Sequence, residues 1–149
     1  MASSSTPPAS SPYADVRRGD EVRRDAEVRR GDEVRRGDIY WVSPDEERGA
    51  VPPIAHPYVV LQDDVFNRSR VHTVVVCALT SNLSRAHEPG NVLLEAGEGN
   101  LPRQSVLIVS QISSVARSAL GAYIGALSNA RVEQALDGMR LQQASFFSR

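Results

Sequence analysis

Short apolar runs dominate the chain from residue 37 onward, and their lengths are those of β-strands. Residues 38–42 are aromatic and β-branched, a composition that favours a strand. Residues 71–79 are apolar almost without alternation, which predicts a strand that is buried on both faces. Four further runs lie at 58–62, 91–95, 105–115 and 122–127, with a glycine- and asparagine-containing turn at 97–102. The pattern therefore predicts short strands throughout this part of the chain.

One helix is expected after the last strand. Ser128 can cap a helix over residues 129–142, and Val132, Leu136 and Met139 then share one face because they stand at i, i+4 and i+7. Residues 44–55 contain three prolines and a glycine, which predicts a loop. Short strands at regular spacing with a terminal helix are typical of a small, strongly bent barrel, so the fold class is mainly β, of the α+β type.

Residues 1–36 differ sharply in composition from the rest of the chain. Residues 2–12 are rich in Ser, Thr and Pro, and a six-residue unit beginning Val-Arg-Arg then starts at positions 16, 22, 28 and 34. In a helix the valines would turn by about 240° per unit and form no apolar stripe. We therefore expect residues 1–36 to be a disordered tail, with the folded domain at 37–149, and deletion of residues 1–35 to leave stability unchanged.

Composition narrows the class of protein. The chain has 149 residues, of which 41% are hydrophobic and 23% are charged, and this is the profile of one soluble domain. The longest apolar run, 74–79, is too short to span a membrane, and residues 1–12 contain no apolar core of a secretory signal. The single cysteine, Cys77, fits a reducing compartment, so we expect a cytoplasmic location. The three histidines stand at no metal-ligand spacing, and no cofactor is expected.

Eight short motifs follow one another along the chain at 37–41, 62–64, 67–69, 74–83, 90–94, 101–106, 110–112 and 124–128. In their order and spacing these motifs resemble the MazF/PemK family of bacterial toxins. The resemblance extends from residue 37 to about residue 141, and it leaves out only the tail. It implies a small SH3-like barrel of the CcdB/PemK type with a C-terminal α-helix. It also implies a homodimer that cuts single-stranded RNA at short sequences and is neutralised by an antitoxin.

RNA cleavage without a metal has chemical needs that can be stated independently of any family. The nucleophile is the substrate's own 2′-hydroxyl, so the protein supplies a base, an acid and donors to the phosphoryl oxygens. In the family a Thr at the end of the long buried strand and an Arg before the strand-initiating Pro carry this work. Thr80 matches the first position, and His56 stands at the second, in place of Arg. Arg48 could supply the missing cation.

Each of these residues also has a structural interpretation. Thr80 could simply bind loop backbone at a strand end, and His56 could be held in a structural role or mark a lost catalytic group. An arginine in an acidic loop, such as Arg48, is often only solvated. For RNA contacts, Gln62, Ser105 and Gln111 match family positions near the substrate groove, and Ser81 and Asn82 are candidates by proximity to Thr80. These side chains could equally satisfy backbone groups at strand ends.

The resemblance therefore predicts a sequence-specific toxin endoribonuclease, an mRNA interferase that cleaves by attack of the 2′-hydroxyl. Its expected partners are single-stranded RNA, a second copy of the chain, a cognate antitoxin, and operator DNA bound through the antitoxin complex. The formal net charge of −1 does not by itself indicate nucleic-acid binding. Two alternatives stay open: a catalytically impaired member that only binds nucleic acid or antitoxin, and a topoisomerase poison like the related CcdB toxins.

Overall fold

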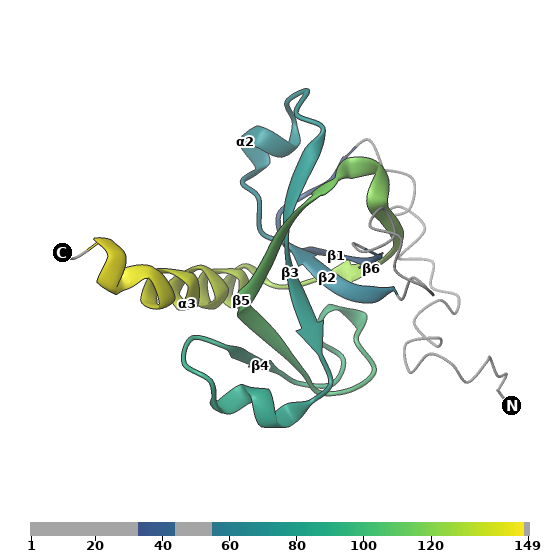
Figure 1. The fold of residues 1–149 in the computed structure, drawn as a ribbon. Coiled ribbons are helices and arrows are strands. Elements are labelled where there is room, and N and C mark those ends of the chain that lie inside the picture. Colours follow the sequence, from purple (N-terminus) through teal and green to yellow (C-terminus); the bar gives the residue numbers. More distant parts are fainter. Residues whose placement is uncertain (1–32, 44–54, 148–149) are drawn as a thin grey trace, which may run out of the picture.

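A computed structural model describes residues 33–43 and 55–147 of the chain, with side chains described as far as residue 144. The expectations for residues 1–32 and for the loop at 44–54 lie outside these described residues. Within them, antiparallel pairing joins the strands into one six-stranded sheet in the order β4-β5-β3-β2-β1-β6 (Figure 1). The strands are β1 (Asp38–Val42), β2 (His56–Val60), β3 (Thr73–Thr80), β4 (Val92–Leu94), β5 (Ser105–Ala116) and β6 (Leu120–Ala126).

Helical segments connect and follow the strands. They are α2 (Asp64–Asn67), η3 (Leu83–His87), η4 (Glu98–Asn100), η5 (Arg117–Ala119) and the terminal α3 (Asn129–Phe147). The expected mainly β fold with a C-terminal helix is confirmed, and every described strand lies where an apolar run predicted one. The short segment α2 was not predicted. It forms because the Asp63 side chain accepts a hydrogen bond from the Val65 backbone N–H at 2.8 Å, which caps its first turn.

Strand β5 bends sharply in the middle of the sheet. Cys77 pairs with Ile112 and Leu79 pairs with Leu107, so residues 108–111 lie opposite Ala78 alone. The Cys77 thiol donates to the Ile108 carbonyl at 2.9 Å, and burial raises the pKa of this thiol to about 12, which keeps the donating proton in place. Extra residues in one strand bend it and increase its twist. The bend lets β5 pair with β4 at one end and with the rest of β3 at the other (Figure 1).

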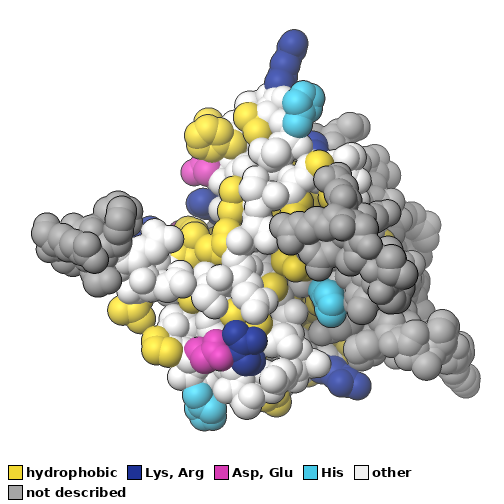
Figure 2. All heavy atoms as spheres, in the orientation of Figure 1, with side chains coloured by type: hydrophobic (Ala, Val, Ile, Leu, Met, Phe, Trp, Pro, Cys, Tyr) yellow, Lys and Arg dark blue, Asp and Glu magenta, His cyan; other side chains and the backbone are white. Residues whose placement is uncertain are grey.

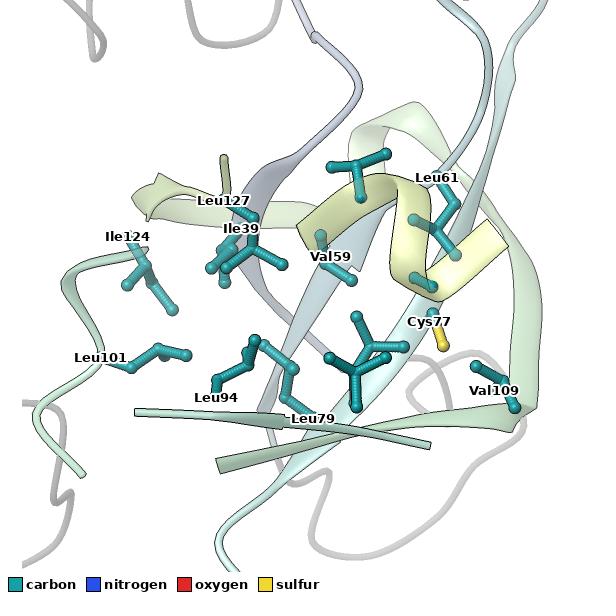
Figure 3. Close-up of a cluster of buried hydrophobic side chains, with 14 residues drawn as sticks. Ile39, Val59, Leu61, Cys77, Leu79, Leu94, Leu101, Val109, Ile124 and Leu127 are labelled. Carbon is teal, nitrogen blue, oxygen red and sulfur yellow. The ribbon is translucent and has the colours of Figure 1, made fainter. Parts of the chain in front are cut away.

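Buried side chains form one cluster on each face of the sheet. The first cluster lies under α3 and includes Ile39, Val59, Leu79 and Leu94 (Figure 3). Strand alternation sends the neighbouring residues to the second cluster, where the rings of Tyr40 and Tyr123 meet edge to face at 5.5 Å. The second cluster comprises Val34, Tyr40, Val42, Val60, Val74, Val76, Val115 and Tyr123.

The predicted apolar face of the last helix is confirmed. Val132, Leu136 and Met139 pack on the first cluster, and the Ser128 hydroxyl accepts a hydrogen bond from the Arg131 backbone N–H at 3.2 Å, which caps α3. Farther along, Gly138 lies so close to the Gly90 carbonyl that a Cβ at Gly138 would overlap its oxygen. No described helix is long and apolar enough to cross a membrane.

The segment directly before β1 belongs to the folded domain, although the sequence placed it in the tail. Val34 is only 2% exposed and packs in the second cluster. The Arg35 N–H donates to Asp38 at 2.9 Å, and the Arg36 N–H donates to the Asp64 carboxylate at 2.7 Å. Burial acts to raise the pKa of Asp64, but hydrogen bonds from Asn67 and from the Arg36 backbone lower it overall. The expected boundary at residue 37 therefore falls inside a packed segment.

Candidate active site

His56 and Thr80 lie at the same end of the sheet, on adjacent strands. His56 begins β2 and Thr80 ends β3, and the two strands are antiparallel. The two strands are paired as far as Tyr58↔Ala78, and continuing this register by two residues along each strand places His56 opposite Thr80. Because side chains alternate, residues two apart point to the same face of a sheet. The two predicted catalytic side chains are therefore brought together on one face.

The neighbours of this pair in the sheet are apolar. Val42 of β1 pairs with His56, and Val106 of β5 pairs with Thr80. Both valines are buried, whereas His56 is exposed and Thr80 is partly exposed. The imidazole of His56 and the hydroxyl of Thr80 thus face solvent between two buried valines on the neighbouring strands. Such a pair can exchange a proton and donate a hydrogen bond to a bound phosphate.

The Thr80 hydroxyl takes part in the turn that follows β3. Its Oγ1 accepts a hydrogen bond from the Asn82 backbone N–H at 3.1 Å. This contact is the backbone interaction that the sequence allowed as a structural role for Thr80. It does not use the hydroxyl proton, because the oxygen serves here as acceptor. Thr80 can therefore hold the turn and donate to a substrate oxygen at the same time.

Asn82 caps the short helix η3. Its Oδ1 accepts hydrogen bonds from the Ser84 N–H at 3.2 Å and from the Ser84 hydroxyl at 2.7 Å. At the far end of η3 the Arg85 guanidinium pairs with the Glu88 carboxylate. The hydrogen bond between them lowers the pKa of Glu88 and raises that of Arg85, which keeps both charged. Both ends of the segment after Thr80 are thereby fixed by polar contacts.

The other predicted contacts near Thr80 differ in exposure. Ser81 is exposed directly beside it. Gln111 is exposed in the bend of β5, next to Ile112, the partner of Cys77. Ser105 is fully buried, pairs with Leu94 of the first cluster and donates its hydroxyl to the Arg103 carbonyl at 3.1 Å. Ser81 and Gln111 are open to a ligand, whereas Ser105 faces the interior on the other side of the sheet from Thr80.

Gln62 lies at the opposite end of β2 from His56. Its Nε2 donates to Asn67 Oδ1 at 2.9 Å and to the Thr73 carbonyl at 3.2 Å, and its Oε1 accepts from the Val75 N–H at 3.3 Å. Both ends of the amide are thus used to join α2 to β3. At a strand rise of about 3.3 Å per residue, six residues separate Gln62 from His56 by about 20 Å. The fold does not bring Gln62 together with His56 and Thr80.

The α2 end of the sheet has a different surface from the His56 end. Val65 and Phe66 of α2 are 64% and 55% exposed, and hydrophobic side chains are visible over this segment in Figure 2. A separate pocket of about 490 Å³ lies between β4 and α3, and its lining includes Leu93 and Leu141 but neither His56 nor Thr80. Among the described residues, no group of three or more His, Cys, Asp and Glu side chains could hold a metal ion. Arg48 lies outside the described residues.

Two residues that support the site were missed by the sequence reasoning. Ser84 meets the Asn82 cap, and Asn91 accepts a hydrogen bond from the Val109 N–H at 3.0 Å in the bend of β5. Asn is a preferred N-cap residue, so the sequence did contain a signal for a cap at Asn82, although not for the hydroxyl of Ser84. No local pattern announces Asn91, because its partner is 18 residues away.

Comparisons with known proteins assign this chain to a family. The family described as PemK-like, MazF-like toxin of type II toxin–antitoxin system matches residues 35–142. Endoribonuclease MazF6 of Mycobacterium tuberculosis is 34% identical over 103 residues, which cover 69% of this chain and 90% of that protein. Endoribonuclease EndoA of Bacillus subtilis is 26% identical over 107 residues, covering 72% of this chain and 91% of that protein.

Solved structures of low sequence identity share the fold. An endoribonuclease in complex with its cognate antitoxin, from Mycobacterial species, superposes with a TM-score of 0.60 at 19% identity over 74% of this chain and 95% of that chain. The matched family segment contains every described strand, and it includes His56 and Thr80. With a relative at 34% identity, this match establishes that the chain belongs to the PemK-like, MazF-like toxin family of type II toxin–antitoxin systems.

Proposed function

We propose that this protein is a toxin endoribonuclease that cleaves single-stranded RNA by attack of the substrate's own 2′-hydroxyl. Membership of the toxin family and similarity to curated endoribonucleases support the activity. The proposed site is supported by one structural observation: His56 and Thr80 lie at the same end and on the same face of adjacent strands. An imidazole and a hydroxyl are groups that this reaction can use.

In the proposed reaction each side chain has one task. The His56 imidazole takes the proton from the 2′-hydroxyl, whose oxygen then bonds to phosphorus. As the bond from phosphorus to the 5′-oxygen breaks, the protonated ring returns the proton to that oxygen. The products are a 2′,3′-cyclic phosphate and a free 5′-hydroxyl. The Thr80 hydroxyl donates to a phosphoryl oxygen, where negative charge builds up in the transition state.

The exposed polar residues beside this pair are proposed to contact the RNA. Ser81 and Gln111 present a hydroxyl and an amide to solvent, and such groups can bind base edges or the 2′-hydroxyl of flanking nucleotides. Arg48 stays a prediction for a phosphate contact. The buried hydroxyl of Ser105 and the Gln62 amide, which is hydrogen-bonded through both its nitrogen and its oxygen, are assigned to the fold.

The proposed partners follow from the same family. We infer an antitoxin that neutralises the protein, a homodimer, and operator DNA bound through the antitoxin complex. A relative of the same fold has been solved with its cognate antitoxin, which supports the first of these. The proposed substrate is cellular mRNA, so the proposed location is the cytoplasm.

The test is cleavage of a long unstructured RNA by the full chain in EDTA, read as discrete fragments on a gel. We expect His56→Ala to lower kcat by about a hundredfold or more, the usual range for losing a positioned acid or base. His72→Ala is the matched control, because His72 is also exposed but lies directly before β3, at the α2 end of the sheet. An unaffected His56→Ala variant would remove the imidazole from the mechanism.

The variant His56→Arg tests whether the reaction needs a group that transfers a proton or only a positive charge at this position. An imidazole exchanges its proton near neutral pH, whereas a guanidinium stays charged. We therefore expect the arginine variant to keep measurable activity with a flatter pH profile. A wild-type protein that shifts RNA without cutting it would favour the binding alternative, and one that does neither would favour the topoisomerase-poison alternative.

A further inference from the structure

Asn82 is the most heavily bonded residue of the turn that follows Thr80. Its backbone N–H donates to Thr80 Oγ1 at 3.1 Å, and its carbonyl accepts from the Arg85 N–H at 3.1 Å. Its side-chain oxygen accepts from both the N–H and the hydroxyl of Ser84. The residue therefore links the end of β3 to the first turn of η3 through main chain and side chain alike.

The far end of η3 is attached to the sheet. The Asn91 side-chain amide donates to the Arg85 carbonyl at 2.9 Å and to the Glu88 carboxylate at 3.1 Å. The oxygen of the same amide accepts from the Val109 N–H at 3.0 Å, in the bend of β5. The turn is thus held between the end of β3 and the most bent part of β5. Asn82, the N-cap of η3, therefore has little freedom to move relative to Thr80.

This arrangement controls the direction of the Thr80 hydroxyl. A threonine hydroxyl has one proton to donate and an oxygen that accepts. The Asn82 N–H approaches the oxygen from the turn, so the lone pair on that side is occupied and the proton must point elsewhere. If the turn loosens, the hydroxyl can rotate among its staggered positions, and fewer molecules present the proton to a substrate.

We infer that Asn82 is a positioning residue for RNA cleavage, which holds the Thr80 hydroxyl in its donating orientation through the cap on η3. The inference rests on the proposed function, and it gives Asn82 a different task from the base contact expected from the sequence. The side-chain oxygen is already occupied by Ser84, so it is not available as a base acceptor. The contribution of Asn82 lies in geometry and reaches the reaction through Thr80.

The first measurement is steady-state cleavage of a short RNA with a single cut site. We expect Asn82→Ala to lower kcat by about tenfold with KM within about twofold, because the cap stabilises the reactive geometry more than it binds substrate. Asn82→Ser, which keeps a capping oxygen, should recover kcat to within about twofold of wild type. Asn129→Ala is the matched control, because it makes the same chemical change at an exposed residue of α3 outside the proposed site, and it should leave kcat unchanged. A raised KM, or a serine variant as poor as alanine, would instead identify a base contact by the amide and overturn the inference.

The second measurement tests coupling to Thr80. If Asn82 acts through that hydroxyl, Asn82→Ala should have no further effect on kcat in a Thr80→Val background. Additive losses in the double variant would contradict the inference. All variants are compared by thermal unfolding, so that a loss of fold is recognised before kinetics are interpreted.

A third measurement needs no activity. Hydrogen exchange of the residue-82 amide should be slow in wild type and in Asn82→Ser, and fast in Asn82→Ala and in Thr80→Val. Slow exchange with unchanged kcat in Asn82→Ala would refute the positioning role while leaving the endoribonuclease intact. Absence of cleavage by the wild type, with the expected exchange pattern, would refute the proposed function and the inference with it.

Discussion

Val34 gives the clearest test of where the folded domain begins. The residue lies before β1, in the last of the Val-Arg-Arg units, and it is 2% exposed within the second cluster. Replacing Val34 with Ala removes apolar atoms equivalent to about two methylenes, worth about 1.6 kcal/mol in transfer free energy. The cavity left among the buried side chains of the second cluster adds to this cost. We therefore expect Val34→Ala to lower the free energy of unfolding by about 2–3 kcal/mol.

Removing the whole segment before residue 37 should lower the free energy of unfolding further than Val34→Ala does. A chain that begins at residue 37 loses Val34 and also the hydrogen bonds from the Arg36 backbone to Asp64 and from Arg36 Nε to the Leu61 carbonyl. Each such bond contributes about 1 kcal/mol. A chain that begins at residue 33 keeps all of these contacts. The shorter chain should consequently be less stable than the longer one by more than Val34→Ala alone.

The assay is urea unfolding followed by circular dichroism, with the slope compared to confirm the same transition. Val65→Ala is the matched control, because it makes the same chemical change at a valine that is 64% exposed, and it should cost less than about 0.5 kcal/mol. Equal stability of the Val34 and Val65 variants would refute the reasoning. So would equal stability of the chains that begin at residues 33 and 37.

Two more predictions concern α3. The Arg131 side chain binds Glu98 through two hydrogen bonds, and these lower the pKa of Glu98. The pair therefore stabilises the fold fully above the ordinary Glu pKa of 4.5, and this stabilisation is lost as the pH falls through the lowered pKa. Arg131→Gln should therefore cost about 1 kcal/mol at pH 7 and less at pH 3 in chemical unfolding, whereas Arg140→Gln, in an exposed pair, should show no such pH dependence. Gly138→Ala should lower the melting temperature although alanine favours helix, because the added Cβ meets the Gly90 carbonyl; a rise in melting temperature would show that the two segments can separate freely.

The strands could be read from the sequence because their signal is local. Aromatic and β-branched runs such as Asp38–Val42 became strands at the expected places. The bend of β5 could not be predicted, since it depends on Cys77 and Asn91 reaching residues that are distant in sequence. The packing of Val34 could not be predicted for a related reason. Val34 looks like every other valine of the repeat, and only its partners in the second cluster distinguish it.

The candidate site was predictable in part. His56 and Thr80 stand at strand ends that an antiparallel pairing brings together, so the sequence motifs and the strand topology both select these two residues. Gln62 and Ser105 also matched motif positions, but motif order says nothing about which face or which end of a strand a side chain occupies. Their hydrogen bonds with Val75 and Arg103 appear only once the register is known.

The sequence Val-Arg-Arg-Gly-Asp occurs three times, at 16–20, 28–32 and 34–38, and the described fold is built on the third copy. Loss or gain of a complete six-residue unit upstream leaves the same five residues joined to Ile39. The segment that supplies Val34 and the two hydrogen-bonding arginines is therefore regenerated whenever the repeat number changes. Variation in the length of the repeat region can accumulate without altering the first element of the domain, whereas a change of one to five residues at the junction would disrupt it.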